Sequence, residues 1–100
     1  MMLWISAFLC GMFAFNALPH LVRGITGQRH MTPFGRSSSA MVNVIWAWVN
    51  LTLAAAFFTG GGGTDDWGVS HWILFMLAGL VISTSLAIFW SNPDARLPWQ

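Results

Sequence analysis

The class of fold is decided by residues 40–59, AMVNVIWAWVNLTLAAAFFT, which contain no charged side chain. A helix of about 20 residues crosses the hydrocarbon core of a bilayer, where backbone groups must find partners within the protein. No polar stripe runs along this segment, although a helix on the surface of a water-soluble protein would need one. The sequence therefore predicts a membrane-spanning helix over residues 40–59.

Two further uncharged stretches of similar length flank this segment. One covers residues 2–18 and the other residues 72–90. Pro19 can end the first helix or kink it, so that an end near Val22 is also open. The sequence thus predicts an all-α integral membrane three-helix bundle that forms one domain over residues 1–100.

The composition agrees with a membrane protein. Of the 100 residues, 56% are hydrophobic and only 7% are charged, whereas soluble domains carry about 25% charged residues. The formal net charge of +1 is too small for the dense basic surface that binds nucleic acid. We therefore expect neither a water-soluble domain nor a nucleic-acid partner.

The charged residues predict the orientation in the membrane. The connector between the first two spans, residues 19–39, carries Arg23, Arg29 and Arg36. The glycine-rich loop 60–71 carries two aspartates and no cation. The positive-inside rule places the connector and Arg96 in the cytoplasm, with the N-terminus outside and the C-terminus inside. At that face, we expect the arginines to contact anionic lipid headgroups or a partner protein.

Uncharged polar residues lie in or beside two of the predicted spans. Asn16 and His20 belong to the first, and Asn43 and Asn50 belong to one face of the second. An amide in hydrocarbon is costly without a partner. We predict that these side chains join the two helices through hydrogen bonds. A polar path for a solute through the same asparagines is the alternative.

Small residues at four-residue spacing predict surfaces for close helix packing. The first span offers Ser6, Cys10 and Ala14. The third span offers Gly79, Ser83 and Ala87. Packing within the chain and self-association both remain open. Cys10 is the only cysteine, so the chain can form no internal disulfide.

The connector has a local pattern of its own. Gly24 and Gly27 argue against one continuous helix. Residues 32–35, Thr-Pro-Phe-Gly, predict a tight turn because proline presets φ and glycine adds freedom. Apolar residues alternate with arginines before this turn, as in a segment that lies at the level of the lipid headgroups.

The sequence predicts no metal site, no cofactor and no enzymatic activity. His20 and His30 lie on the predicted cytoplasmic side, whereas His71 lies on the other, so the three cannot share one ion. Asp65 and Asp66 beside His71 are expected to form a solvated loop. No nucleophile with a neighbouring base and no phosphate-binding glycine loop is present.

Four short motifs carry a resemblance to a known group. They are Asn16-Ala-Leu-Pro-His20, Gly24-Ile-Thr-Gly27, Thr32-Pro-Phe-Gly35 and Asn43-Val-Ile-Trp46. Together they resemble a group of small bacterial multi-span inner-membrane proteins, over roughly residues 11 to 58. The resemblance implies a bacterial inner-membrane location and no particular activity. Cations that are all arginine are compatible with a GC-rich genome, such as that of an actinobacterium.

Three hypotheses for function follow. The leading one is a small non-enzymatic accessory or stabilising subunit of a larger membrane complex, such as a lipid transporter, since the chain is similar in size and type to the small helical subunits of such complexes. The alternative is a self-assembling channel or small-solute carrier. The third is an electron-transfer subunit that contacts haem or a quinone.

Overall fold

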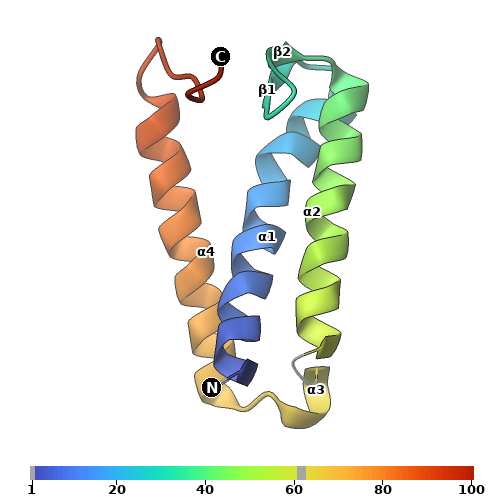
Figure 1. The fold of residues 1–100 in the computed structure, drawn as a ribbon, viewed down its shortest axis with the longest axis vertical. Helices are drawn as coiled ribbons and strands as arrows, with labels where there is room; N and C mark the ends of the chain where they lie inside the picture. The colour runs from blue at the N-terminus through green and yellow to red at the C-terminus, as the bar shows by residue number, and fades with distance from the viewer. Residues whose placement is uncertain (1, 61–62) are drawn as a thin grey trace.

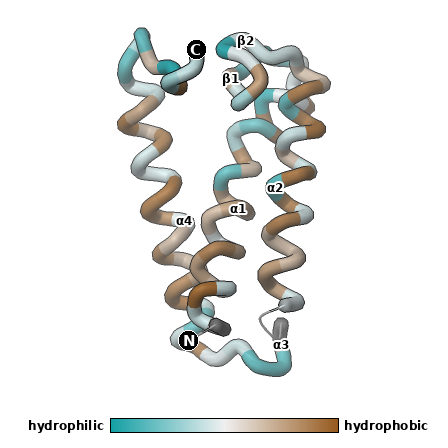
Figure 2. The backbone as a smooth tube through the Cα atoms, in the orientation of Figure 1, coloured by the Kyte–Doolittle hydropathy of each residue, from teal (hydrophilic) through white to brown (hydrophobic). Residues whose placement is uncertain are grey.

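The computed structural model describes residues 2–60 and 63–100, and three long helices dominate it (Figure 1). These helices are α1 (Met2–Ile25), α2 (Ala40–Gly60) and α4 (Val69–Trp90). Shorter elements connect them: β1 (His30–Thr32), β2 (Gly35–Ser38) and α3 (Gly63–Asp66). All three long helices are long and apolar enough to cross a membrane. Figure 2 shows that hydrophobic residues fill their central parts, whereas hydrophilic residues lie mostly toward the ends of the molecule.

Helix α1 stands in the middle, with α2 on one side and α4 on the other (Figure 1). The molecule measures 40 Å along its longest axis and 24 Å across, which is sufficient for a hydrocarbon core of about 30 Å. The N-terminus and α3 lie at one end, and the hairpin and the C-terminus lie at the other. We call these the α3 end and the hairpin end.

The first helix is longer than the sequence predicted. An end at Leu18 is wrong, because α1 continues through Pro19 to Ile25. Proline removes a single backbone donor, a loss that a membrane helix tolerates. The helix stops at Gly27, whose φ of 74° is left-handed. The N–H of Gln28 donates to the carbonyl of Arg23 at 2.8 Å, which completes a Schellman motif.

The prediction of an all-α fold with three long helices is confirmed, and the connector adds a short two-stranded β-hairpin that was not predicted. Strands β1 and β2 pair antiparallel, with an irregularity between His30 and Thr32. The predicted tight turn is confirmed, with Pro33 and Phe34 at its tip. After the hairpin, the side chain of Ser39 accepts a hydrogen bond from the N–H of Val42, which caps the start of α2.

The segment between α2 and α4 is more structured than the predicted loop 60–71. It contains the short helix α3, and α4 begins at Val69, three residues before the predicted start at Trp72. At this start the N–H of Gly68 donates to Nδ1 of His71 at 3.1 Å. The histidine thus satisfies a backbone donor that precedes the first turn.

An apolar core occupies the α3 end. Its buried members come from α1, α2 and the segment before α4, and they are Ala7, Cys10, Ala54 and Trp67. Phenylalanines surround this cluster, and the rings of Phe13 and Phe57 stack with centroids 5.7 Å apart. Polar side chains occupy the α1–α2 interface nearer the hairpin end, and these define the candidate site.

Candidate functional site

Two hydrogen-bonded pairs join α1 to α2. Nδ2 of Asn16 donates to Oδ1 of Asn50 at 3.1 Å. One helical turn further along, Nδ1 of His20 lies 2.8 Å from Oδ1 of Asn43. Asn43 and Asn50 are 0% and 1% exposed, whereas Asn16 is half-buried. The four polar residues singled out in the sequence thus meet in two pairs.

The contacts of Asn43 fix the protonation of the His20 ring. Nδ2 of Asn43 donates to the backbone carbonyls of His30, Ser38 and Ser39, at 3.0 to 3.1 Å. The amide oxygen therefore faces His20 and can only accept, so the proton of the neutral ring is on Nδ1. Nε2 of His20 then carries a free lone pair. Asn43 also ties the hairpin to α2 through these carbonyls.

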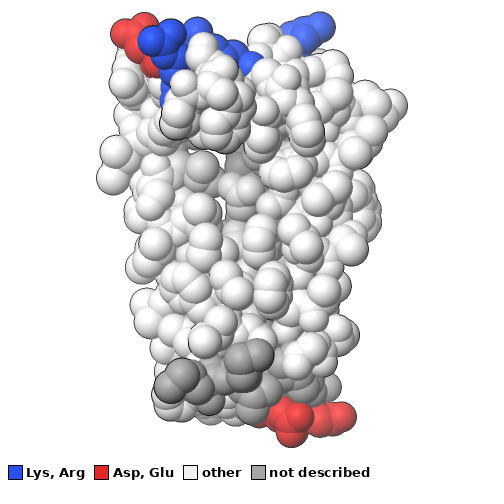
Figure 3. All heavy atoms as spheres, viewed as in Figure 1, with Lys and Arg blue, Asp and Glu red and all other residues white. Residues whose placement is uncertain are grey.

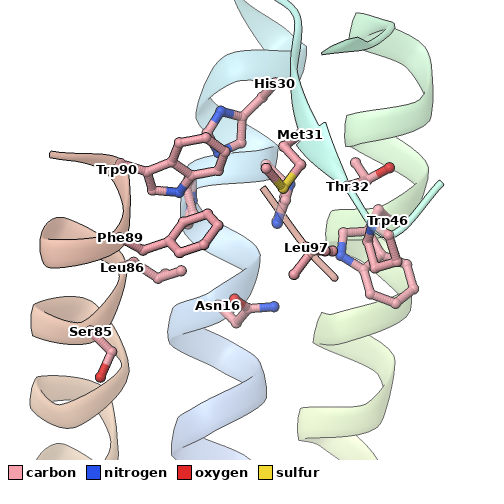
Figure 4. Close-up of a pocket in the computed structure, with 13 residues that line it drawn as sticks. Asn16, His30, Met31, Thr32, Trp46, Ser85, Leu86, Phe89, Trp90 and Leu97 are labelled. Carbon is pink, nitrogen blue, oxygen red and sulfur yellow. The ribbon is translucent and has the colours of Figure 1, made fainter. Parts of the chain in front are cut away.

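A cavity of about 350 Å³ lies beside this ring at the hairpin end, and we call it the hairpin cavity. All three long helices, the hairpin and the C-terminal segment contribute to its walls (Figure 4). Most of the lining side chains are apolar or aromatic. The polar ones include Asn16, His20 and His30, and the aromatic ones include Trp46, Phe89 and Trp90.

His30 is the residue that connects the hairpin to the cavity and to α4. Its ring centroid is 5.3 Å from that of His20 and 4.4 Å from that of Trp90. Figure 4 shows the His30 ring against the Trp90 indole. Nε2 of His30 is buried and has no hydrogen-bond partner among the described residues.

The ring of His30 is neutral at neutral pH. Burial, together with the neighbouring His20 and Arg23, lowers the pKa of this group from the ordinary value of 6.5 to about 4. A cation in this position would lose hydration and face other positive charge.

The C-terminal segment packs against the hairpin beside the cavity. Nε1 of Trp99 donates to the carbonyl of Pro33 at 3.0 Å, and Nε2 of Gln100 donates to the carbonyl of Thr32 at 2.8 Å. Leu97, between α4 and these contacts, lines the cavity. Sequence reasoning missed these contacts, because nothing in the local pattern of residues 91–100 signals a contact with the hairpin.

The three arginines of the connector are exposed at the hairpin end. Arg29 donates to the carbonyl of Ser37 within the hairpin, and Arg36 approaches the carbonyl of Ala95 at 3.5 Å. Arg23 approaches Oε1 of Gln28 at 3.4 Å. Figure 3 shows arginine atoms gathered at this end, with some acidic atoms beside them, whereas the coloured atoms at the opposite end are acidic. The charged groups available for headgroups or a partner therefore share one end of the molecule.

The small residues predicted to pack helices are placed unequally. On α1, Cys10 is buried, and Ser6 and Ala14 are half-buried. On α4, Gly79 is buried against Phe15, whereas Ser83 and Ala87 are exposed. The first stripe therefore lies inside the chain, and the second is only partly covered.

Two glycines that sequence reasoning did not assign to packing lie against the backbone of a neighbouring helix. A Cβ atom at Gly11 would overlap the backbone carbonyl of Phe75 in α4. A Cβ atom at Gly24 would lie 2.9 Å from the carbonyl oxygen of Ala40 in α2. The four-residue spacing of Ala7 and Gly11 is the only sequence signal that could have pointed to the first of these.

Metal ligands do not gather in the part of the chain that the structure describes. Among these residues, no group of three or more histidine, cysteine or acidic side chains could hold an ion. His20 and His30 are adjacent, whereas His71 caps α4 at the other end. Asp65 and Asp66 are exposed on the short helix α3.

Comparison of the chain with models of known protein families, with curated proteins and with solved structures found no match.

Proposed function

We propose that this chain is a non-enzymatic integral membrane protein that serves as an accessory or stabilising subunit of a larger membrane complex, such as a transporter. The observation that carries the proposal is the incomplete bundle. Helices α2 and α4 flank α1 on opposite sides, and large apolar side chains of both are exposed. Such an arrangement leaves room for helices of another chain.

The outer surface of α4 supports the same proposal. In lipid, helices associate through close packing of small residues and through polar contacts, because the hydrophobic effect between them is weak. Ser83 and Ala87 continue the small-residue stripe beyond Gly79, and both are exposed. A helix of the partner complex could approach α4 closely along this stripe.

We further propose that the hairpin end faces the cytoplasm of a bacterial inner membrane. The arginines lie at this end, together with the C-terminus, and Asp65 and Asp66 lie at the other. Arginine near the cytoplasmic leaflet attracts anionic lipid, at about 1 kcal/mol for each residue. The exposed arginines can thus contact headgroups or a charged loop of the host complex.

A solute path along Asn16, Asn43 and Asn50 receives no comparable support. Asn16 and Asn50 bond to each other, and Asn43 bonds to His20 and to three carbonyls. Amides that are paired and buried in this way contribute to helix association. We therefore do not favour the channel hypothesis.

Photo-crosslinking in native membranes tests the subunit proposal. A photoreactive amino acid at Ser83 examines the small-residue stripe, and the same group at the exposed Val81, on another face of α4, is the matched control. We expect a discrete crosslinked band of higher mass from Ser83 and a weaker one from Val81. If both positions give only the uncrosslinked chain, and the protein leaves the membrane alone in mild detergent, the subunit proposal is wrong.

A further inference from the structure

We propose that the hairpin cavity binds an amphiphile with a flat ring that carries a hydroxyl group, such as a phenol or a quinol with an alkyl tail. This inference goes beyond the role of a subunit, because it assigns a ligand to the chain itself. It rests on the hydrogen-bond acceptor of His20, on the aromatic walls and on the size of the cavity.

His20 offers a hydrogen-bond acceptor to a ligand in the cavity. Because Asn43 holds the proton of His20 on Nδ1, Nε2 of His20 can only accept. His20 is one of the residues that line the cavity. The hydroxyl group of a phenol donates a hydrogen bond, so it can satisfy this acceptor.

The rest of the cavity has room for a ring. Its volume of about 350 Å³ is far larger than the roughly 30 Å³ that one water molecule occupies in the liquid. Trp46 lies on one side, and Phe89 and Trp90 lie on the other (Figure 4). Aromatic walls with a few polar atoms are typical of sites that bind small apolar molecules. Pro19 and Leu86 add further apolar surface, on which an alkyl tail can lie.

A matched pair of ligands tests the proposal on the purified chain in nanodiscs. The probes are a ring-brominated para-decylphenol and its methyl ether, and bromine in contact with Trp46 or Trp90 quenches tryptophan fluorescence. The ether keeps the ring and the tail but cannot donate a hydrogen bond. We expect the phenol to bind roughly tenfold more tightly than the ether, which is the scale of one net hydrogen bond.

Variants of residues that line the cavity provide a second test of the proposal. His20→Phe removes the acceptor, and we expect the phenol and the ether then to bind with equal affinity. Leu86→Phe fills the cavity, and we expect it to abolish saturable quenching by both probes. Leu80→Phe, on the exposed face of α4 away from the cavity, should leave binding unchanged.

Each outcome decides the proposal. If the wild-type chain binds the phenol and the ether with equal affinity, the hairpin cavity accepts any alkyl chain and the proposal is wrong. If neither probe gives saturable quenching, water or lipid fills the cavity and the proposal is also wrong. If His20→Phe does not fold, two results still decide the proposal. One is the ratio of the affinities of the wild-type chain for the phenol and the ether. The other is the comparison of Leu86→Phe with Leu80→Phe. Because binding to the purified chain is measured without a host complex, failure here is distinct from failure of the crosslinking experiment.

Discussion

Asn43 is the side chain on which the most polar contacts converge. Its oxygen accepts from His20 and its nitrogen faces three backbone carbonyls, so one residue connects α1, α2 and the hairpin. Its side chain is 0% exposed. Loss of this amide leaves several buried groups without partners, and such groups cost about 1 to 3 kcal/mol each.

This difference in partners predicts unequal effects of two alanine substitutions. Asn43→Ala should lower the free energy of unfolding by about 2 to 3 kcal/mol. Asn50→Ala removes one contact between helices, from Asn16, and should cost about 1 kcal/mol. The exposed Thr52 bonds only to a carbonyl of its own helix, so Thr52→Ala serves as the neutral control. SDS titration in bicelles measures all three values, and equal losses at Asn43 and Asn50 would contradict the convergence of contacts on Asn43.

His30 predicts a dependence of stability on pH. The pKa of His30 is about 4 in the folded chain, and its ordinary value is 6.5. Between these pH values the unfolded chain binds more protons than the folded chain, so stability falls as the pH falls from about 6.5 to about 4. We expect the Tm of the wild type to drop between about pH 7 and about pH 5.

The variant His30→Gln isolates this effect, because it keeps a polar side chain and cannot be protonated. Its Tm should change less over the same interval, since one group that binds a proton on unfolding has been removed. Identical pH profiles of the wild type and His30→Gln would show that the histidine contributes nothing to the change.

At the residue scale, the sequence predicted which side chains meet but not how. Asparagine in an uncharged span predicts a buried partner, so Asn16, Asn43 and Asn50 could be singled out. The pairing of His20 with Asn43 depends on the rotation of α1 relative to α2, which no single segment encodes. The cavity depends on contacts between residues as distant as Thr32 and Gln100, and it could not be predicted.

At the scale of elements, two glycines set how closely the helices approach. Gly11 faces α4 and Gly24 faces α2, and a Cβ atom at either would meet backbone. At Gly79 the added atom would meet the ring of Phe15, which is a side chain and can turn.

These contacts predict an order of effects for three substitutions. Gly11→Ala and Gly24→Ala should each destabilise the bundle by about 1 to 3 kcal/mol, as overpacking does, and Gly79→Ala should cost less. Gly60→Ala, with no atom of the described residues within 4 Å of the new atom, should be neutral or slightly stabilising. Thermal unfolding in detergent, followed by circular dichroism, ranks the four variants. If Gly60→Ala lowers the Tm as much as Gly24→Ala does, the result would argue against the close approach of α1 and α2 at Gly24.

The sequence predicted the three long helices well because absence of charge over about 20 residues is a strong signal. The hairpin was missed, since residues 30–38 lack the alternating apolar pattern and the Asn-Gly turn that usually reveal one. Its formation depends instead on tertiary contacts, notably from Asn43 to the carbonyls of His30 and Ser38. The end of α1 was predicted too early, because a proline can either end a membrane helix or lie inside it, as Pro19 does.

At the scale of the whole molecule, the arginines are gathered at one end, whereas acidic residues lie at both ends. The connector arginines and the C-terminus lie at the hairpin end, and Asp65 and Asp66 lie at the α3 end. Between these ends the long helices are apolar, with their amides paired inside. This placement of the arginines is the basis for the proposed orientation, and the proposed subunit role and ligand site both assume a bundle that spans the membrane.

Labelling of engineered cysteines in intact cells tests that orientation most directly. In a Cys10→Ala background, Asp65→Cys places a thiol at the exposed α3 end, and Ser37→Cys places one at the exposed hairpin end. With a membrane-impermeant maleimide, the account predicts that Asp65→Cys is labelled in intact cells and that Ser37→Cys is labelled only after the membrane is permeabilised. Labelling of Ser37→Cys in intact cells, or equal access to both positions, would contradict a bundle that spans the membrane with its arginine end in the cytoplasm.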